Sequence, residues 1–377
     1  MKYLAVLGRQ PEISIAELNA QLPEADFWTG PDKAVSPTVL GFRLRAAGDP
    51  PAPSPVHISR FGGTLKLAVE LIEKPLDYLA KLPEGKITIG VSDYSKGASK
   101  KTAATEALKL KKILVRHGRS VRVVENKDAV LSTATSLHNG LSGNNEKKVE
   151  LIKVENEWYR VIGVQDIEAY AKRDQARPAR DAKVGMLPPK LAQVLINLCG
   201  PLKPDSVVLD PFCGTGVVLQ EALLMGYKAF GTDINDRMIE YSDKNLKHFK
   251  FSDYIVEVGD AMNCRWKGKI DAVACEGYLG KPFLRIPNDM ELKEQKQECG
   301  SIVLGFLKNL AGQIKKDTPV VIAVPAWLRS DNSYERLDVL DEIEKLGYNV
   351  NNKSREGLLY HRPGQIVARD IIILRKK

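Results

Sequence analysis

Residues 191–377 alternate between two hydrophobic patterns, and this alternation limits the possible folds more than any other feature of the chain. Short apolar runs typical of buried strands, such as SVVLD at 206–210, are separated by stretches of helical periodicity, such as GVVLQEALLMG at 216–226. Strands that alternate with helices form a mostly parallel sheet with helices on both faces. We therefore expect a doubly wound α/β domain over 191–377, with helices at about 289–315 and at 334–347.

The beginning of the chain predicts a different kind of domain. Residues 1–80 contain apolar strands and one amphipathic helix, SIAELNAQL, which predicts a small α+β domain. Ser14 is the expected N-cap of that helix, and Glu17 stands three residues later as in a capping box. The segment GDPPAPSPV at 48–56 has four prolines in nine residues and predicts a loop.

Residues 81–165 predict a second α+β domain, followed by a linker at 166–190. The main helix of this domain, TAATEALKLKKILVRHG, ends with residues typical of a helix C-terminus. Its expected apolar stripe consists of Ala104, Ala107, Leu108 and Leu114. The linker is polar and rich in Arg, Asp and Pro, so we expect it to lie against the domain that follows.

The positive charge of the chain is concentrated in one segment. The formal net charge is +9, and nine basic residues lie between positions 96 and 122 with only Glu106 against them, which gives +8. They are Lys96, Lys100, Lys101, Lys109, Lys111, Lys112, Arg116, Arg119 and Arg122. A concentrated positive field favours a polyanion such as RNA as the partner. The alternative is a solvated helix face that happens to be basic.

Cysteine spacing and hydropathy exclude several other classes of protein. The five cysteines form no C-x-x-C pair and have no histidine at ligand spacing, so we expect neither a metal site nor a disulfide framework. Reduced thiols fit a cytoplasmic location. The apolar runs are far shorter than the ~20 residues that cross a bilayer, and the apolar start is too short for a signal peptide.

The segment VVLDPFCGTGVVLQ at 207–220 predicts a strand, a glycine turn and a helix. Gly214 and Gly216 would let the backbone approach a ligand closely, because neither has a Cβ. A dinucleotide fingerprint needs a third glycine, but that position is Leu219. A phosphate-binding P-loop needs Gly-Lys-Ser or Gly-Lys-Thr, but Val217 follows Gly216. The turn therefore points to a ligand without phosphates.

One aspartate is expected at the end of each of three successive strands. Asp210 ends the strand before the glycine turn, and Asp233 ends the next strand, where a carboxylate can accept hydrogen bonds from a ribose diol. Asp260 ends the third strand, where it can accept from an adenine amine. Aspartate is common after strands, but the three together beside DPFCGTG favour a positively charged nucleoside without phosphates, S-adenosylmethionine.

At this point the chain resembles the THUMP-containing tRNA guanine-N2 methyltransferases, in which an RNA-binding half precedes a Rossmann-like methyltransferase domain. The resemblance covers most of the chain and rests on DPFCGTG, on TSLHNGL at 135–141, on RDQARPARDAKVGMLPPKLAQ at 173–193 and on the closing YHRPGQIVARDIIIL. It implies a ferredoxin-like domain at 1–80 and a THUMP domain at 81–165 that binds tRNA through the basic segment.

The resemblance also implies which residues hold the cofactor. Met186, Leu187 and Pro188 would close over S-adenosylmethionine. The expected binding residues at the strand ends are Asp210, Phe212, Gly214, Gly216, Asp233, Ile234, Asp260 and Ala261.

The chain departs from this family where the chemistry should occur. Amino-directed methyltransferases carry D-P-P-Y or N-P-P-Y after the fourth strand, whereas this chain has IDAVACEGYLG at 270–280. Aligned without a gap, Glu276 takes the place of the aspartate, and Tyr278 is the aromatic residue that has moved by one position. Glu276 can still accept a hydrogen bond from an exocyclic N–H and keep the nitrogen lone pair directed at the methyl group.

Several interpretations of this departure remain open. The favoured one is a variant site that methylates N2 of a guanine in tRNA. Others are a changed target base or atom, DNA amino-methylation, and a non-catalytic protein that binds the cofactor and RNA. Cys275 is a weaker alternative as a nucleophile, because the usual Pro-Cys pair is absent. The linker residues Arg173, Arg177 and Arg180 either contact RNA phosphates or pair with Asp174 and Asp181.

Overall fold

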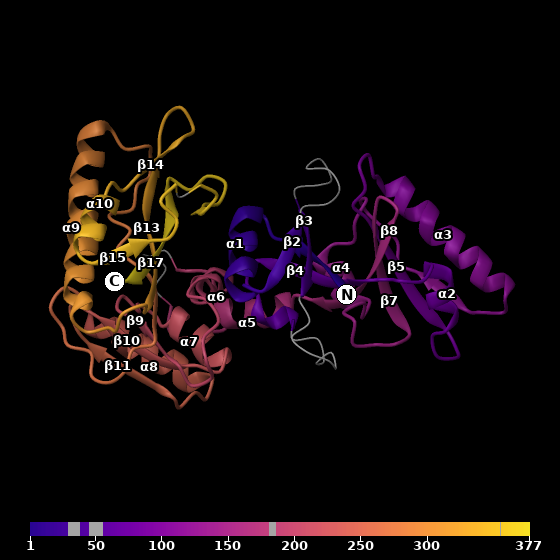
Figure 1. Cartoon of the computed structure of the whole chain (residues 1–377), viewed down its shortest axis with the longest axis horizontal. Coiled ribbons are helices and arrows are strands. Elements are labelled where there is room, and N and C mark those ends of the chain that lie inside the picture. The colour runs from indigo at the N-terminus through magenta and orange to yellow at the C-terminus, as the bar shows by residue number, and fades with distance from the viewer. Residues whose placement is uncertain (29–37, 45–55, 181–185, 355) are drawn as a thin grey trace. The chain divides into compact units, whose positions relative to one another are not determined.

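The structure is a computed structural model that describes all residues except 29–37, 45–55, 181–185 and 355 (Figure 1). The chain divides into two compact units. The first contains residues 1–15 and 22–170, and the second contains 16–21 and 171–377. The expected proline-rich loop at 48–56 falls almost entirely outside the described residues.

The first unit contains an eight-stranded mixed sheet. Its order is β2-β3-β1-β4-β8-β7-β5-β6, and only β5 pairs in parallel, with β6 and β7. Residues 1–80 and 81–165 therefore contribute strands to one continuous sheet. The strands are β1 (Lys2–Leu7), β2 (Ala25–Trp28), β3 (Val39–Leu44), β4 (Thr64–Glu70), β5 (Ile87–Asp93), β6 (Val121–Val123), β7 (Lys148–Val154) and β8 (Glu157–Val164).

Short and long helices accompany this sheet. They are α1 (Pro11–Gln21), the 3-10 helix η1 (Ile58–Arg60), α2 (Pro75–Ala80), α3 (Lys100–Arg116), α4 (Thr133–His138) and α5 (Ile167–Gln175). The boundary between the units passes through α1 and α5. Helix α3 packs on β5 and β6.

The expected cap at Ser14 is wrong. Helix α1 begins at Pro11, because proline is suited to the first turn, where its missing N–H is not needed. Ser14 lies one turn inside the helix and is 1% exposed. Its hydroxyl donates to the carbonyl oxygen of Gly63 over 2.7 Å, so it ties α1 to the start of β4.

The expected apolar stripe of α3 is only partly correct. The buried residues are Ala103, Ala107, Leu110 and Leu114, which recur with the spacing of a single helix face. Leu108 lies off this face and is 57% exposed. The predicted helix end is confirmed, since His117 is the C-cap and Gly118 has a φ of +79°.

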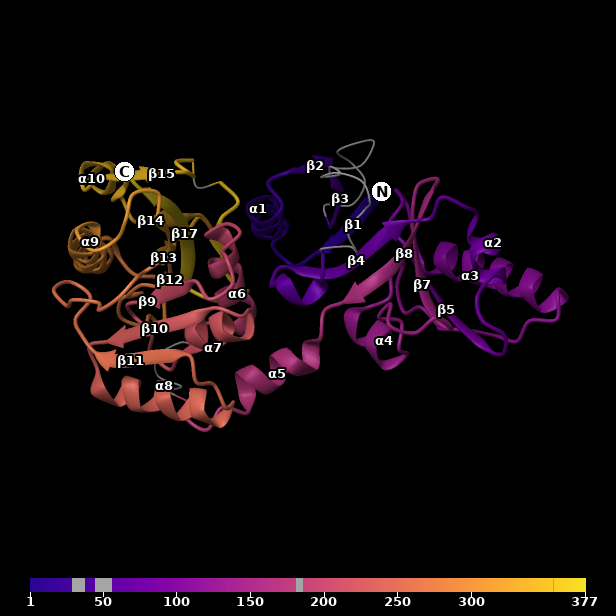
Figure 2. The ribbon, with the colours of Figure 1, turned by 60° about the horizontal axis from the view of Figure 1, so that its bottom comes forward.

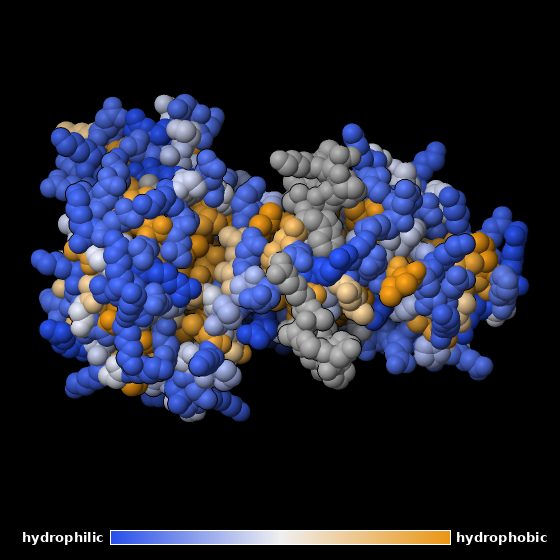
Figure 3. Space-filling model, viewed as in Figure 1, coloured by the Kyte–Doolittle hydropathy of each residue, from blue (hydrophilic) through white to orange (hydrophobic). Residues whose placement is uncertain are grey.

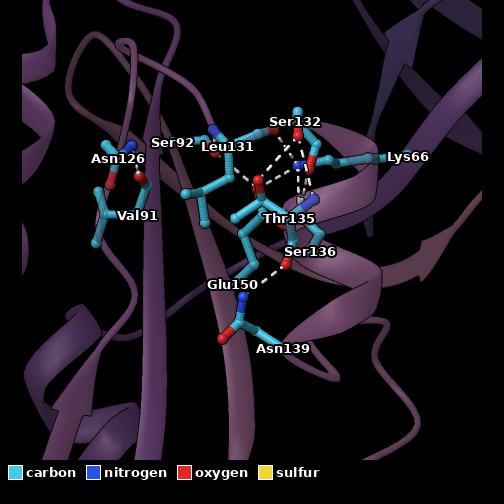
Figure 4. A network of polar contacts seen from close by, with 10 residues as sticks. All are labelled: Lys66, Val91, Ser92, Asn126, Leu131, Ser132, Thr135, Ser136, Asn139 and Glu150. Carbon is cyan, nitrogen blue, oxygen red and sulfur yellow. Dashed lines mark hydrogen bonds and ion pairs between the residues drawn. The ribbon is translucent and has the colours of Figure 1, made fainter.

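A buried polar network joins α4 to the sheet of the first unit (Figure 4). Lys66 on β4 donates to Glu150 on β7 over 2.5 Å, and both side chains are at most 2% exposed. Lys66 also donates to Ser136 and to the carbonyl oxygen of Leu131, and Ser92 donates to Glu150. Buried charges are tolerated when they are paired and hydrogen-bonded in this way.

The second unit confirms the expected doubly wound sheet of Rossmann-like type. Its order is β11-β10-β9-β12-β13-β17-β15, in which the strands from β11 to β13 are parallel and β17 is antiparallel. The strands are β9 (Val207–Asp210), β10 (Lys228–Asp233), β11 (Tyr254–Val258), β12 (Ala272–Glu276), β13 (Pro319–Leu328), β14 (Tyr334–Arg336), β15 (Tyr348–Val350), β16 (Leu359–Tyr360) and β17 (Val367–Lys376).

Helices cover both faces of this sheet (Figure 2). The first three, α6 (Pro189–Leu198), α7 (Val217–Leu224) and α8 (Asp236–His248), pack on one face. On the other face, α9 (Asp289–Ala311) and α10 (Leu340–Lys345) enclose the main apolar core, which includes Phe306 and Trp327.

The helix expected at 334–347 is wrong over its first half. Residues Tyr334–Arg336 form β14, which pairs with the long strand β13, and only Leu340–Lys345 are helical. The turn between the two strands is closed by a hydrogen bond from Arg329 N–H to the Ser333 carbonyl oxygen. An open edge of β13 offers backbone hydrogen bonds that a helix over these residues would leave unmade.

The face of the molecule drawn in Figure 3 is mainly hydrophilic. No helix among the described residues is long and apolar enough to cross a membrane.

Candidate active site

Four carboxylates stand at the ends of four neighbouring parallel strands in the second unit. Asp210 ends β9, Asp233 ends β10 and Glu276 ends β12, while Asp260 follows β11 by two residues. Since these strands are adjacent in the order β11-β10-β9-β12, the four side chains lie along one edge of the sheet. This is the edge at which doubly wound sheets bind their ligands.

The glycine turn between β9 and α7 requires glycine at two positions. Gly214 has a φ of +49° and Gly216 a φ of +82°, which L-residues with a Cβ rarely adopt. A Cβ on Gly216 would also lie 2.7 Å from Oγ of Ser242 on α8. Ser242 donates to the Gly214 carbonyl oxygen over 2.9 Å, so a hydrogen bond from α8 fixes the turn.

Asp233 and Asp260 each accept hydrogen bonds from neighbouring loops. Asp233 accepts from the N–H of Gly214 and from the N–H of Asn235, both over 2.9 Å. Asp260 accepts from the N–H of Met262 and from the side-chain amide of Asn263. A carboxylate offers about four acceptor sites, so both retain capacity for a ligand.

Asp210 is the most deeply buried of the four carboxylates, at 2% exposed. Burial raises the pKa of Asp210 well above its ordinary value, and the nearby charges of Asp233 and Glu276 raise it further. The N–H of Phe212 donates to it and opposes this shift. A cation at this place would offset both the cost of burying the Asp210 charge and the repulsion between the carboxylates.

Two apolar side chains beside these carboxylates face solvent. Ile234, directly after Asp233, is 73% exposed, and Met262, two residues after Asp260, is 43% exposed. Of the other expected contacts, Ala261 is buried, and the ring of Phe212 packs edge-on against Phe306 with centroids 5.3 Å apart.

Glu276 forms an ion pair that the sequence did not reveal. Nε of Arg369 on β17 donates to Oε1 of Glu276, and the two side chains are 6% and 16% exposed. Burial raises the pKa of Glu276, and Arg369 opposes this shift. The described residues make no further hydrogen bond to Glu276, so Oε2 remains available as an acceptor.

Strand β12 ends at Glu276, and the residue that follows still bonds the neighbouring strand β13. The N–H of Gly277 donates to the Ala323 carbonyl oxygen over 2.9 Å, a bond that a proline at this position cannot make. Tyr278 is partly buried against the core of the second unit, and burial raises its pKa. Gly280 has a φ of +82°, and a Cβ there would lie 2.4 Å from Gln295.

The middle of the linker is attached to the glycine turn and to the helices beside it. Arg173 makes two hydrogen bonds to the buried carboxylate of Glu221 on α7, and Nη1 of Arg177 donates to the hydroxyl of Thr215 in the turn. The side chain of Asn245 on α8 bonds both backbone groups of Ala179 and also the Thr215 carbonyl oxygen. Arg173 and Arg177 are therefore held within the unit.

Of the expected pairings inside the linker, the structure contains one. Nη2 of Arg177 lies 3.8 Å from Oδ1 of Asp174, whereas Asp181 is outside the described residues. Leu187 is buried, and Pro188 is the N-cap of α6. Met186 contacts Arg177 through its sulfur.

The cysteines lie in the second unit without disulfides. Burial raises the pKa of Cys213 and of Cys275 well above the ordinary value, which keeps both as neutral thiols. This environment argues against Cys275 as a nucleophile. No cluster of metal-ligating side chains occurs in the part of the chain that the structure describes.

The basic segment lies on and around α3 in the first unit. Exposed lysines Lys96, Lys101 and Lys109 line a cavity of about 420 Å³ at the start of α3, together with Lys153 of β7. Other members are engaged elsewhere: Arg119 donates to the carbonyl oxygen of Leu82. Arg122 donates to Asn139 over 2.9 Å, and Lys100 pairs with Glu125. On α3, Lys112 and Arg116 are exposed, and Lys111 is half-buried.

Comparison with known proteins identifies the class to which the candidate site corresponds. Residues 177–284, which contain all four carboxylates, match the family model of UPF0020, an RMKL-like methyltransferase domain. The resemblance expected from the sequence is confirmed over this segment.

Individual relatives narrow the comparison. The chain is 42% identical over 109 residues to the tRNA (guanine(10)-N2)-dimethyltransferase of Methanothermobacter thermautotrophicus, covering 28% of this chain and 32% of the relative. It is 35% identical over 153 residues to the protein of the same name from Pyrococcus abyssi, covering 40% and 43%. The chain thus spans a third to less than half of these relatives. A crystal structure of TrmN from Thermus thermophilus aligns over 100% of both chains, at 17% identity and a TM-score of 0.49.

Proposed function

We propose that this chain is an S-adenosylmethionine-dependent methyltransferase that modifies the exocyclic N2 of a guanine in tRNA. The observation that carries the proposal is the group of carboxylates around the glycine turn, in which the buried Asp210 has a pKa raised by burial and by Asp233 and Glu276. Such a site repels phosphates and favours a cationic ligand.

The residues at the strand ends suit S-adenosylmethionine. Asp233 has acceptor capacity for the ribose diol and Asp260 for the adenine amine, and the exposed side chains of Ile234 and Met262 offer apolar contact to a base. Gly214 and Gly216 let the backbone approach, and Phe212, Ala261, Leu187 and Pro188 stay predicted contacts. The cofactor supplies an activated methyl group on a positively charged sulfur.

Glu276 is the proposed catalytic residue. Its Oε2 would accept an N–H of the target amine, which directs the nitrogen lone pair toward the methyl carbon. As the new N–C bond forms, positive charge develops on the nitrogen, and the nearby carboxylate stabilises it and can hold the departing proton. Tyr278, directly after Gly277, stays a candidate to contact the base.

The proposed partner is tRNA, bound through the first unit. The cavity at the start of α3 carries four lysines, of which Lys96 and Lys101 are exposed and make no ion pair in the described structure. Lysines in this arrangement fit backbone phosphates. The target, guanine N2, is taken from the names of the relatives, and guanine 10 is the first nucleotide to test.

The test separates binding from chemistry. Calorimetry with S-adenosylmethionine, followed by transfer of a tritiated methyl group to bulk tRNA, should give both binding and transfer. Cofactor binding without transfer to any RNA would favour the non-catalytic alternative, and transfer to DNA would favour amino-methylation of DNA.

A further inference from the structure

The side chain of Arg369 crosses a neighbouring strand to reach Glu276. Strand β13 lies between β12 and β17, with Glu276 opposite Ala323 and Arg369 opposite Pro325. Residues two positions apart on a strand point to the same face, so all four side chains share one face. Ala323 has only a methyl group there, which leaves room for the guanidinium to pass.

Arg369 approaches Glu276 from beyond the carboxyl end of β12. Pro325 lies two residues beyond Ala323 toward the carboxyl end of β13, so Arg369 stands further out than Glu276 itself. Its Nε bonds Oε1 alone, and no described residue bonds Oε2. One carboxylate oxygen is therefore fixed by the protein, and the other is left for a ligand.

The backbone after Glu276 is held by the hydrogen bond from Gly277 to Ala323, but it lacks the stiffness of two prolines. In the D-P-P-Y motif of the family that the chain resembles, two prolines follow the acidic residue and stiffen the backbone. Here Gly277 and Tyr278 follow, and glycine is the least restricted of all residues. A glutamate also has one more rotatable bond than an aspartate, so its carboxylate needs a further contact to hold one orientation.

We propose that Arg369 is a positioning residue, which fixes Oε1 of Glu276 and thereby presents Oε2 to the target amine. This inference rests on the proposed methyl transfer. The ion pair from β17 would restrain Glu276 where the family has two prolines. Arg369 acts through Glu276 and has no contact of its own with the amine.

A double-mutant cycle in the full chain tests this role. We expect Arg369→Gln to lower single-turnover methyl transfer to tRNA by about ten- to a hundredfold, the value of a charged hydrogen bond. The acid limb of the pH-rate profile should move to higher pH, because Arg369 no longer opposes the raised pKa of Glu276. Some rate should therefore return as the pH rises, and Arg369→Lys should keep more activity than Arg369→Gln.

In the Glu276→Gln background, Arg369→Gln should have almost no further effect, since the group through which it acts is gone. Arg336→Gln is the matched control, because Arg336 pairs with Asp370 on the opposite face of β17 over 3.2 Å. It should lower stability without moving the pH profile. Affinity for S-adenosylhomocysteine, measured by calorimetry, should stay within about twofold in Arg369→Gln, because the sulfur of this ligand is neutral and Arg369 bonds Glu276 and none of the residues expected to hold the nucleoside.

Three results would overturn the inference. These are an unchanged rate and pH profile in Arg369→Gln, an equal loss in both Glu276 backgrounds, or the same pH shift in Arg336→Gln. Failure of the parent chain to transfer methyl groups would instead count against the proposed function itself.

Discussion

The backbone N–H of Gly214 donates a hydrogen bond to the carboxylate of Asp233 over 2.9 Å. This bond joins the glycine turn after β9 to the end of the neighbouring strand β10. The carboxylate that is proposed to hold the ribose therefore also holds the turn in place, and substitutions at Asp233 test two roles together.

Replacing Asp233 should weaken binding of the cofactor. Asp233→Ala removes the acceptor for the ribose and for Gly214, and each charge-assisted bond contributes roughly 1.5–3 kcal/mol. We expect the affinity for S-adenosylmethionine to fall about ten- to a hundredfold or more. Asp233→Asn keeps one oxygen acceptor and should lose less. Calorimetry measures both, and an affinity unchanged in Asp233→Ala would place the nucleoside elsewhere.

Cofactor binding should release protons from the carboxylate group at the strand ends. Burial, Asp233 and Glu276 raise the pKa of Asp210, and a bound sulfonium cation would lower it again. Affinity for S-adenosylmethionine should therefore rise with pH between the ordinary range of an aspartate and the raised pKa of Asp210. The neutral sulfur of S-adenosylhomocysteine should show less of this dependence.

Calorimetry in buffers of different ionisation enthalpy, from about pH 5 to pH 8, counts the released protons. Asp210→Asn should remove most of the effect. A binding enthalpy that is the same in every buffer and at every pH would show that Asp210 does not sense the charge of the cofactor.

The buried pair in the first unit should matter for stability and not for the cofactor. Lys66→Met leaves Glu150 buried without its cation, which costs about 3–5 kcal/mol. Adding Glu150→Leu to it should recover much of this loss, because the unpaired charge is then gone. Denaturant-dependent amide exchange on β4 and β7 measures the change, while affinity for S-adenosylhomocysteine stays constant. Exchange unaltered by Lys66→Met would show that the network contributes little.

Reversing charges at the cavity of α3 should weaken RNA binding. We expect Lys96→Glu, Lys101→Glu and Lys109→Glu together to lower tRNA affinity and to reduce the slope of log affinity against log salt by about two to three. Lys345→Glu is the control, because Lys345 is an exposed side chain on α10 of the second unit. If the affinity of the parent chain does not change with salt, the basic segment is a solvated helix face.

Local patterns predicted the doubly wound sheet, the glycine turn and the carboxylates, because each depends on residues close in sequence. Arg369 was not predicted as the partner of Glu276, since their contact depends on β17 lying beside β13 and on a small residue at Ala323. Asn245 was missed for a similar reason: an asparagine inside a helix pattern gives no sign that it bonds the backbone of Ala179 and Thr215.

The same limit explains the errors in the helices. Ser14 has the sequence context of a cap, but its hydroxyl bonds Gly63, which is 49 residues away. Residues 334–336 continue the helical pattern of the residues after them, but they pair with β13 and form a strand. In both cases a tertiary hydrogen bond outweighs the local preference.

Mass spectrometry of nucleosides from tRNA incubated with the chain and S-adenosylmethionine tests the central claim most directly. The account predicts methyl groups on N2 of guanine with the parent chain, and a rate about 10²–10³ lower with Glu276→Gln, which removes the charge that stabilises the developing positive nitrogen. Glu276→Asp should also be slower than the parent, because its carboxylate falls short by one bond. Methylation of another atom, or a Glu276→Gln variant as active as the parent, would contradict it.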